Sequence, residues 1–256
     1  MNKSAVISVR HLVKKFGTFV ANDDLTFDVF KGEIFGFIGA NGAGKTTTIR
    51  ILCGLSKPTS GEIFVDGYDV YKQAEQIKRR IGYMCQKFSL YEDLTVSENL
   101  RLYGGIYGLR SGDIRERIDT LLDELELQNQ RNTLIVDLPV GWRQKLAFSV
   151  AVFHSPSIVF LDEPTGGVDP ITRRQFWDLI YRASHDGITV FVTTHYMDEA
   201  EYCDRVSIMS EGKIVALDKP AVLKEHYEAG SMNEVFLKIA RLGASIDRGK
   251  KGTTGS

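Results

Sequence analysis

Apolar and polar residues alternate differently in successive parts of the chain, and each pattern predicts a type of element. Leu25, Phe27 and Val29 are separated by polar residues, which is typical of a strand with one buried face. Almost wholly apolar runs, which favour strands covered on both faces, occupy residues 34–38, 158–161 and 189–193. A helical pattern at residues 172–184 separates the last two runs. Strands that alternate with helices in this way indicate an α/β fold.

The middle of the chain has a helical character. Thr95 and Glu98 have the spacing of a capping box, which predicts that a helix begins there. Further on, apolar residues fall on one helical face, namely Ile114, Ile118, Leu121, Leu122 and Leu125. We therefore predict a helical subdomain over about residues 88–155, inserted into the strand-and-helix core.

The C-terminal part adds a hairpin and a tail. Short strand patterns flank Ser210-Glu211-Gly212, which predicts a tight turn between paired strands. Residues 248–256 contain no apolar side chain. We predict a single domain over residues 1–243 and a disordered tail over residues 244–256. The alternative for this tail is a basic contact with lipid or with a partner.

Composition and charge exclude several classes of protein. The chain has 32 basic and 33 acidic residues, a balance that argues against a dominant nucleic-acid or anionic-membrane surface. The cysteines, Cys53, Cys85 and Cys203, lack the spacing of a zinc site or of a disulfide framework. No stretch approaches the ~18 consecutive apolar residues of a membrane-spanning helix, so another chain would have to supply a membrane pore.

A phosphate-binding sequence follows the first apolar run. It fits the pattern G-x-x-x-x-G-K-[ST] with Gly39, Ala40, Asn41, Gly42, Ala43, Gly44, Lys45 and Thr46. Glycines let the backbone curl so that successive N–H groups point at a triphosphate, and the following helix adds its positive end. Lys45 supplies a positive charge to the phosphates, and Thr46 offers a hydroxyl to Mg²⁺. The strand before this loop and the helix after it are the context that the motif requires.

Two carboxylates end the second apolar run, at Asp162 and Glu163. In a P-loop protein, this position places Asp162 near the metal and lets Glu163 orient or deprotonate the attacking water. His195 follows the third apolar run, from which its side chain would reach the γ-phosphate. A strand that ends in Asp-Glu is common, and a single histidine is usually structural. These assignments therefore depend on the P-loop.

In this order, these motifs resemble those of the nucleotide-binding subunit of an ATP-binding cassette (ABC) transporter. The resemblance covers about residues 5–225. It implies a RecA-like P-loop core, an N-terminal antiparallel β subdomain and an inserted α-helical subdomain. ATP and Mg²⁺ are the implied ligands. The residues implied for the metal are Thr46, Gln86 and Asp162, and those implied for catalysis are Lys45, Glu163 and His195.

The resemblance also implies contacts to the nucleotide outside the carboxylate pair. Phe16 matches the aromatic residue that stacks on adenine, and Gln86 matches the glutamine that touches Mg²⁺ and faces the permease. Asp169 lies in a segment similar to the D-loop, whereas Thr47 extends the P-loop that the family calls Walker A.

One motif departs from the family pattern. The family signature is usually Leu-Ser-Gly-Gly-Gln, whereas this chain has Leu138-Pro139-Val140-Gly141-Trp142. In the family, this segment begins a helix and contacts the γ-phosphate bound by the opposite subunit, which implies such contacts for Leu138, Pro139 and Gly141. Loss of the serine hydroxyl removes a hydrogen bond to a charged group, worth roughly 1.5–3 kcal/mol. We therefore expect a closed dimer that is weaker or that depends on a partner. The altered form resembles bacterial multidrug-type exporter cassettes.

The resemblance implies an ATP-hydrolysing subunit that drives export of a drug-like or lipid-like small molecule. Its partners would be an integral membrane permease and a second, identical or related, cassette at the cytoplasmic face of the plasma (inner) membrane, and no nucleic acid is expected. One alternative is a soluble ABC ATPase in translation or DNA repair, although such proteins usually carry paired cassettes or long insertions. The other alternative is a regulatory ATP sensor without turnover, which only the altered signature supports.

Overall fold

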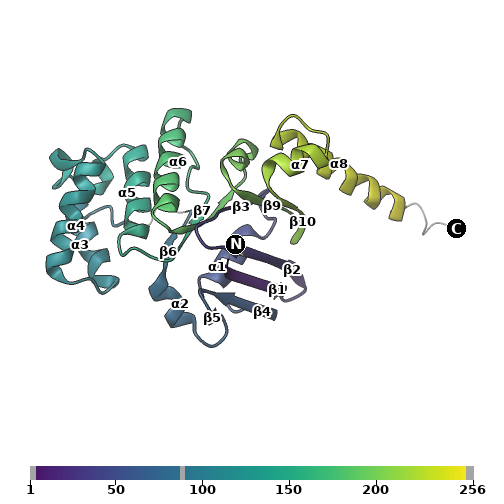
Figure 1. Ribbon diagram of the computed structural model, residues 1–256, viewed down its shortest axis with the longest axis horizontal. Coiled ribbons are helices and arrows are strands. Elements are labelled where there is room, and N and C mark those ends of the chain that lie inside the picture. Colours follow the sequence, from purple (N-terminus) through teal and green to yellow (C-terminus); the bar gives the residue numbers. More distant parts are fainter. Residues whose placement is uncertain (1–3, 87–89, 252–256) are drawn as a thin grey trace.

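Two β-sheets and a helical insert make up the part of the chain that the computed structural model describes, residues 4–86 and 90–251 (Figure 1). The smaller sheet has the strand order β2-β1-β4-β5 and is antiparallel. Its strands are β1 (Ala5–Phe16), β2 (Phe19–Phe30), β4 (Ser60–Val65) and β5 (Tyr68–Asp69). This sheet confirms the predicted N-terminal antiparallel subdomain.

The larger sheet has the order β10-β9-β3-β8-β7-β6. Its strands are β3 (Ile34–Gly39), β6 (Ile81–Met84), β7 (Ile158–Asp162), β8 (Thr189–Thr194), β9 (Arg205–Ser210) and β10 (Lys213–Asp218). All neighbours pair in parallel except β9 and β10, which form the predicted hairpin. Every residue of β3, β7 and β8 is buried, as their almost wholly apolar sequences predict.

Helices pack around the larger sheet (Figure 1). They are α1 (Lys45–Leu52), α2 (Ala74–Arg80), α6 (Pro170–His185), the 3-10 helix η3 (Met197–Tyr202) and α7 (Pro220–His226). Between the two sheets, the rings of Phe27, Phe35, Phe37 and Phe191 pack with centroids 5.3 to 6.5 Å apart. This aromatic core fixes β3 and β8 side by side, which determines where the loops after them begin.

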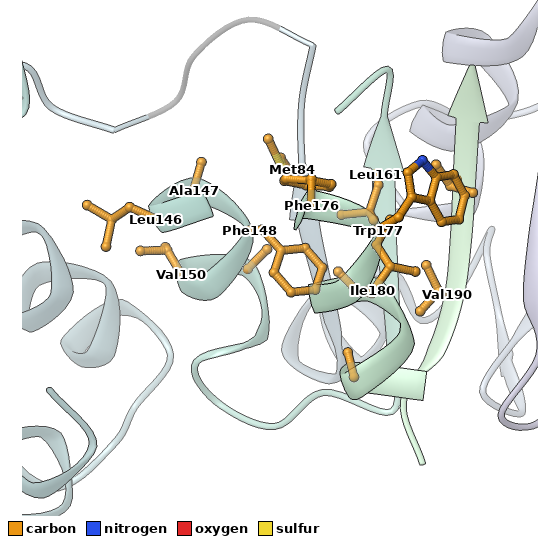
Figure 2. Close-up of a cluster of buried hydrophobic side chains, with 14 of the residues drawn as sticks. Met84, Leu146, Ala147, Phe148, Val150, Leu161, Phe176, Trp177, Ile180 and Val190 are labelled. Atoms are coloured by element: carbon orange, nitrogen blue, oxygen red, sulfur yellow. The ribbon is translucent and has the colours of Figure 1, made fainter. Parts of the chain in front are cut away.

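The helical insert consists of α3 (Val96–Ile106), α4 (Ser111–Glu124) and α5 (Val140–Val152), with short 3-10 turns η1 (Gln128–Gln130) and η2 (Ile135–Asp137). These elements lie within the predicted range of 88–155, of which residues 88 and 89 are outside the described residues. The capping box at Thr95 and Glu98 is confirmed. Helix α5 joins the insert to the core, because Phe148 packs edge-on against Phe176 of α6 (Figure 2).

The C-terminal helix α8 (Met232–Lys251) projects from the body of the molecule (Figure 1). Helix α8 includes residues 244–251 of the predicted tail, whereas residues 252–256 lie outside the described part. A helix that has already begun gains one hydrogen bond for each residue added.

The described residues also bear on the cysteines and on membrane-spanning helices. Cys53 and Cys203 are buried, and no disulfide joins them to each other or to Cys85. None of the described helices combines the length and apolar character that a membrane span requires.

Candidate functional site

Loops from four neighbouring strands meet at one edge of the larger sheet. Strands β3, β8, β7 and β6 lie side by side and run in the same direction, so the residues that follow their carboxyl ends share that edge. The phosphate-binding loop follows β3, the carboxylate pair ends β7, His195 follows β8, and Gln86 follows β6. The fold therefore brings together segments that are more than 100 residues apart in the sequence.

Glycines in the phosphate-binding loop serve different purposes. Gly44 has a φ of +104°, and a Cβ there would lie 2.4 Å from the carbonyl oxygen of Ala21. A Cβ on Gly39 would lie 2.5 Å from the carbonyl oxygen of Met209. Gly42 has a φ of +82° but faces open space. Gly44 and Gly39 are thus required because the loop packs closely against β2 and β9. Gly42 is favoured because its φ is positive.

The loop is exposed at its tip and anchored at both ends. Ala40, Asn41 and Gly42 are exposed, whereas the side chain of Ala43 is buried. Thr46 is exposed and Thr47 half-buried in the first turn of α1. The loop and the N-terminus of α1 therefore present backbone N–H groups and hydroxyls on one open surface, as phosphate binding requires.

Lys45 connects the loop to the carboxylate pair. Its ammonium donates to the carbonyl oxygens of Gly39 at 2.8 Å and Ala40 at 3.1 Å. The same Nζ lies 3.3 Å from Oε1 of Glu163. Only 4% of the lysine side chain is exposed, so this charge is largely removed from water. It lies where it can interact strongly with any anion that the loop binds.

Asp162 is held by two hydroxyls. Its Oδ1 accepts from the hydroxyl of Thr193 at 2.6 Å and from that of Thr46 at 3.3 Å. Burial raises the pKa of Asp162, and the hydrogen bonds from Thr193 and Thr46 act in the opposite direction. A carboxylate beside a hydroxyl is a pair of hard oxygen ligands, which suits Mg²⁺.

No group of three or more His, Cys, Asp or Glu side chains in the described residues could hold a metal alone. A Mg²⁺ ion on Thr46 and Asp162 would thus take its other ligands from water and phosphate oxygens, which is how proteins usually bind this ion. The residues present therefore fit Mg²⁺ bound together with a nucleotide.

Glu163 is the centre of the site. Its Oε1 faces Lys45, and its Oε2 lies 3.0 Å from Nε2 of Gln86 and 3.1 Å from Nδ1 of His195. The backbone φ of Glu163 is +50°, a strained conformation that costs of order 1–3 kcal/mol and is found most often at functional sites. Its N–H donates to both the carbonyl oxygen and the hydroxyl of Thr193, each at 3.1 Å. These contacts fix the direction of the carboxylate.

Two other predicted residues lie apart from this centre. Phe16 ends β1 with 54% of its surface exposed, and the Lys14 ammonium lies 4.7 Å from its ring centroid. Asp169 caps α6, because its carboxylate accepts from the N–H groups of Ile171 and Thr172 and from the Thr172 hydroxyl. The structure thus gives Asp169 a capping role, and Phe16 is available for stacking.

The signature segment begins α5. Leu138 is buried, and Pro139 occupies the N-cap position of α5. A Cβ on Gly141 would lie 2.7 Å from Cγ2 of Thr172. The absence of a side chain at this position therefore lets α5 approach α6 closely.

A cavity of about 160 Å³ separates the first turns of α5 from the carboxylate pair. Its lining includes Gln86, Arg143, Gln144 and Glu163. The Gln144 amide donates to the carbonyl oxygen of Gly166 at 3.0 Å, so the insert contacts the loop after β7 directly.

Sequence reasoning missed Thr193 and Glu199. Thr193 is fully buried and holds Asp162, and its hydroxyl near the carboxyl end of a buried strand was the available signal. Glu199 is fully buried beside Thr165, and nothing in its local sequence distinguishes it from a surface glutamate.

Residues 22–166, more than half of the chain, match the protein family that is described as "ABC transporter". The chain belongs to this family. The predicted family is thereby confirmed, and with it the α/β P-loop fold.

Known relatives of the cassette include transport proteins. It is 48% identical over 239 residues to the probable multidrug ABC transporter ATP-binding protein YbhF of Escherichia coli (strain K12). That match covers 91% of this chain but 41% of the relative, so the chain spans about two fifths of that protein. It is 37% identical to the Nod factor export ATP-binding protein I of Cupriavidus pinatubonensis, covering 91% of this chain and 72% of the relative.

Solved structures agree with this assignment. The ATP-binding subunit of an ABC transporter superposes with a TM-score of 0.83 at 29% identity, covering 92% of the cassette and 99% of that chain. A cassette solved as a dimer in a post-hydrolysis state, bound to ADP and Pi, gives a TM-score of 0.75 at 27% identity, covering 83% of the cassette and 98% of that chain.

Proposed function

We propose that this cassette binds and hydrolyses ATP and thereby drives the export of a small molecule through a separate membrane permease. The observation that carries the proposal is the convergence of Lys45, Gln86 and His195 on the carboxylate of Glu163. A buried carboxylate beside a phosphate-binding loop is positioned to accept a proton from a water molecule.

In the proposed reaction, the loop N–H groups and Lys45 hold the β- and γ-phosphates. The oxygen of a water molecule attacks the γ-phosphorus, Glu163 accepts a proton from that water, and the bond to the bridging oxygen breaks to release ADP. His195 orients Glu163 and donates to the γ-phosphate. Because these groups are already in position, little reorganisation is required during the reaction.

Mg²⁺ would be held by Thr46 and Asp162, with Gln86 nearby, and would neutralise charge on the phosphate oxygens. Among the described residues, the hydroxyls of Thr46 and Thr193 keep Asp162 turned toward α1, on the side where the phosphates bind.

A second cassette would complete each site. In this proposal, Leu138, Pro139, Gly141 and Asp169 of one cassette contact the ATP held by the other, as in a head-to-tail dimer of identical or related subunits. The dimeric cassette bound to ADP and Pi among the similar structures supports such an arrangement.

The relatives' names support export, and we propose the location with it. The similar proteins are named for multidrug transport and for Nod factor export, which supports a drug-like or lipid-like cargo. The cassette would then be peripheral at the cytoplasmic face of the plasma (inner) membrane, bound to an integral permease.

The decisive experiment measures phosphate release by the purified chain with Mg²⁺·ATP, beside Glu163→Gln. Turnover that this substitution abolishes would support the proposal. If the chain binds ATP without turnover, candidate permeases and partner cassettes are added next. A continued lack of turnover would then favour a regulatory ATP sensor. Co-purification with RNA instead of a membrane protein would favour the soluble ATPase.

A further inference from the structure

Glu199 is a fully buried carboxylate in η3, four residues after His195. Its Oε1 accepts a hydrogen bond of 2.5 Å from the hydroxyl of Thr165, which is itself 1% exposed. No protein donor within the described residues reaches its Oε2. The contacts of this carboxylate are therefore made through one oxygen, away from water, where such interactions are strong.

The bond between Thr165 and Glu199 joins two segments that already meet at a second point. Strands β7 and β8 pair in parallel, with Asp162 opposite Thr193. Directly after them, Glu163 contacts His195 at 3.1 Å. Two residues beyond Glu163 and four beyond His195, the same two segments meet again at Thr165 and Glu199. The loops that carry the two catalytic side chains therefore contact each other twice, at Glu163 and His195 and again at Thr165 and Glu199.

Arg173 of α6 extends this connection. Its Nε lies 3.6 Å from Oε1 of Glu199, and its guanidinium carbon lies 4.0 Å from the ring centroid of Tyr196. The Tyr196 ring in turn lies 4.2 Å from the imidazole of His195, centroid to centroid. One face of His195 is therefore backed by a tyrosine that an arginine holds. That arginine lies between two carboxylates, because its guanidinium also donates to Oδ2 of Asp198 at 3.5 Å.

We propose that Glu199 is a positioning residue that joins the loop after Glu163 to the segment after His195, so that the two catalytic groups keep one relative geometry. The kinetic part of this inference rests on the proposed ATP hydrolysis, in which Glu163 and His195 act together. Glu199 itself touches neither of these side chains. It acts through Thr165 on one side and through Arg173 and Tyr196 on the other.

The main variant is Glu199→Gln, which keeps the size and one acceptor oxygen but removes the charge that attracts Arg173. Thr165→Val removes the hydrogen bond from Thr165 to Glu199 with little change of shape. Glu201→Gln is the matched control, because Glu201 lies in the same 3-10 helix but pairs with Lys224 of α7. We expect both test variants to lower kcat for ATP hydrolysis by about 10- to 100-fold with less than about a twofold change in ATP affinity. The control should retain wild-type turnover.

Epistasis with His195 separates positioning from general damage to the fold. In a His195→Ala background, single-turnover rates should fall less than about twofold further on adding Glu199→Gln, because the group that it positions is already absent. An equal loss in both backgrounds would show that Glu199 acts independently of His195 and would overturn the inference.

Hydrogen–deuterium exchange tests the connection without any need for turnover. Glu199→Gln and Thr165→Val should each raise exchange in both residues 163–169 and residues 195–202, whereas Glu201→Gln should not affect residues 163–169. Exchange raised in only one of the two segments would overturn the connection. If the wild-type protein lacks ATPase activity, the proposed function fails, while this measurement still decides whether Glu199 joins the two loops.

Discussion

The ammonium of Lys45 lies 3.3 Å from Oε1 of Glu163, and the two side chains are only 4% and 8% exposed. The cation proposed to bind phosphate and the carboxylate proposed to activate water thus neutralise each other in this structure. Phosphate oxygens that reach Lys45 would compete with the Glu163 carboxylate for the ammonium group. Substrate binding and release of the catalytic base are therefore linked through one ion pair.

Glu163→Gln should consequently affect binding and chemistry in opposite directions. Turnover should fall by more than about 100-fold, because the amide cannot accept the proton from water. ATP affinity should rise by about two- to fivefold, because Lys45 no longer has to give up an ion pair with residue 163 when it binds the phosphates. Fluorescent-nucleotide titration beside phosphate release checks both effects, with exposed Glu62→Gln as the control. Weaker ATP binding by the Glu163 variant would contradict the linkage.

Gly141→Ala should destabilise the protein by about 1–3 kcal/mol, because the new methyl group would overlap Cγ2 of Thr172. Adding Thr172→Ser removes that methyl, keeps the hydroxyl that binds Asp169, and should restore most of the loss. Urea unfolding of the single and double variants measures this. Gly105→Ala, at an open position within α3, should instead be neutral or stabilising by up to about 1 kcal/mol. A Gly141→Ala protein as stable as the wild type would mean that α5 and α6 are less closely packed.

The prediction for Phe16 concerns the base of the nucleotide. Phe16→Ala should weaken ATP binding roughly 5- to 150-fold, because one aromatic ring stacked on a base is worth about 1–3 kcal/mol. Phe19 is the matched control, because it pairs with Phe16 across the hairpin and is 62% exposed. If Phe19→Ala causes the larger loss in calorimetric titration, the stacking assignment belongs to Phe19.

Much of this site was predictable because its motifs follow buried parallel strands. Apolar runs that end at Gly39 and Asp162 indicated strands, and parallel strands place their carboxyl ends together. The partners of Glu199 were not predictable, since its contacts with Thr165 and Arg173 join residues 34 and 26 positions apart. Asp169 shows the same limit, because one carboxylate fits both a helix cap and a nucleotide contact.

A half-buried histidine makes stability depend on pH. His154 stacks on Tyr107 with centroids 3.8 Å apart, and its Nε2 lies 3.2 Å from the carbonyl oxygen of Ile81. Burial lowers the pKa of His154 below its ordinary 6.5, and burial raises the pKa of Tyr107 to about 12. Below about pH 6.5, the unfolded chain therefore binds a proton that the folded chain resists. The contribution of neutral His154 to the free energy of unfolding is fully present above pH 6.5. It is lost as the pH falls from there through the pKa of His154 in the folded protein.

The matching variant is His154→Phe, which keeps the stack on Tyr107 and removes the titration. Its free energy of unfolding should fall less than that of the wild type between pH 7.5 and 5.5 in urea titrations. His185→Gln, at a side chain that is 92% exposed, should leave the wild-type pH dependence unchanged. Parallel curves for the wild type and His154→Phe would show that His154 is not the group responsible.

The chain leaves the core for the helical insert after β6 and returns before β7, and these two strands are hydrogen-bonded neighbours. Because β6 and β7 run in parallel, the chain leaves for the insert at the carboxyl end of β6, beside Gln86, and returns at the amino end of β7, away from Glu163. In mechanical terms the insert is a lever, and one of its two attachments lies at the proposed site of ATP hydrolysis. Any rotation there displaces the distant ends of α3 and α4 further than it displaces the atoms at the site, because displacement grows with distance from the axis.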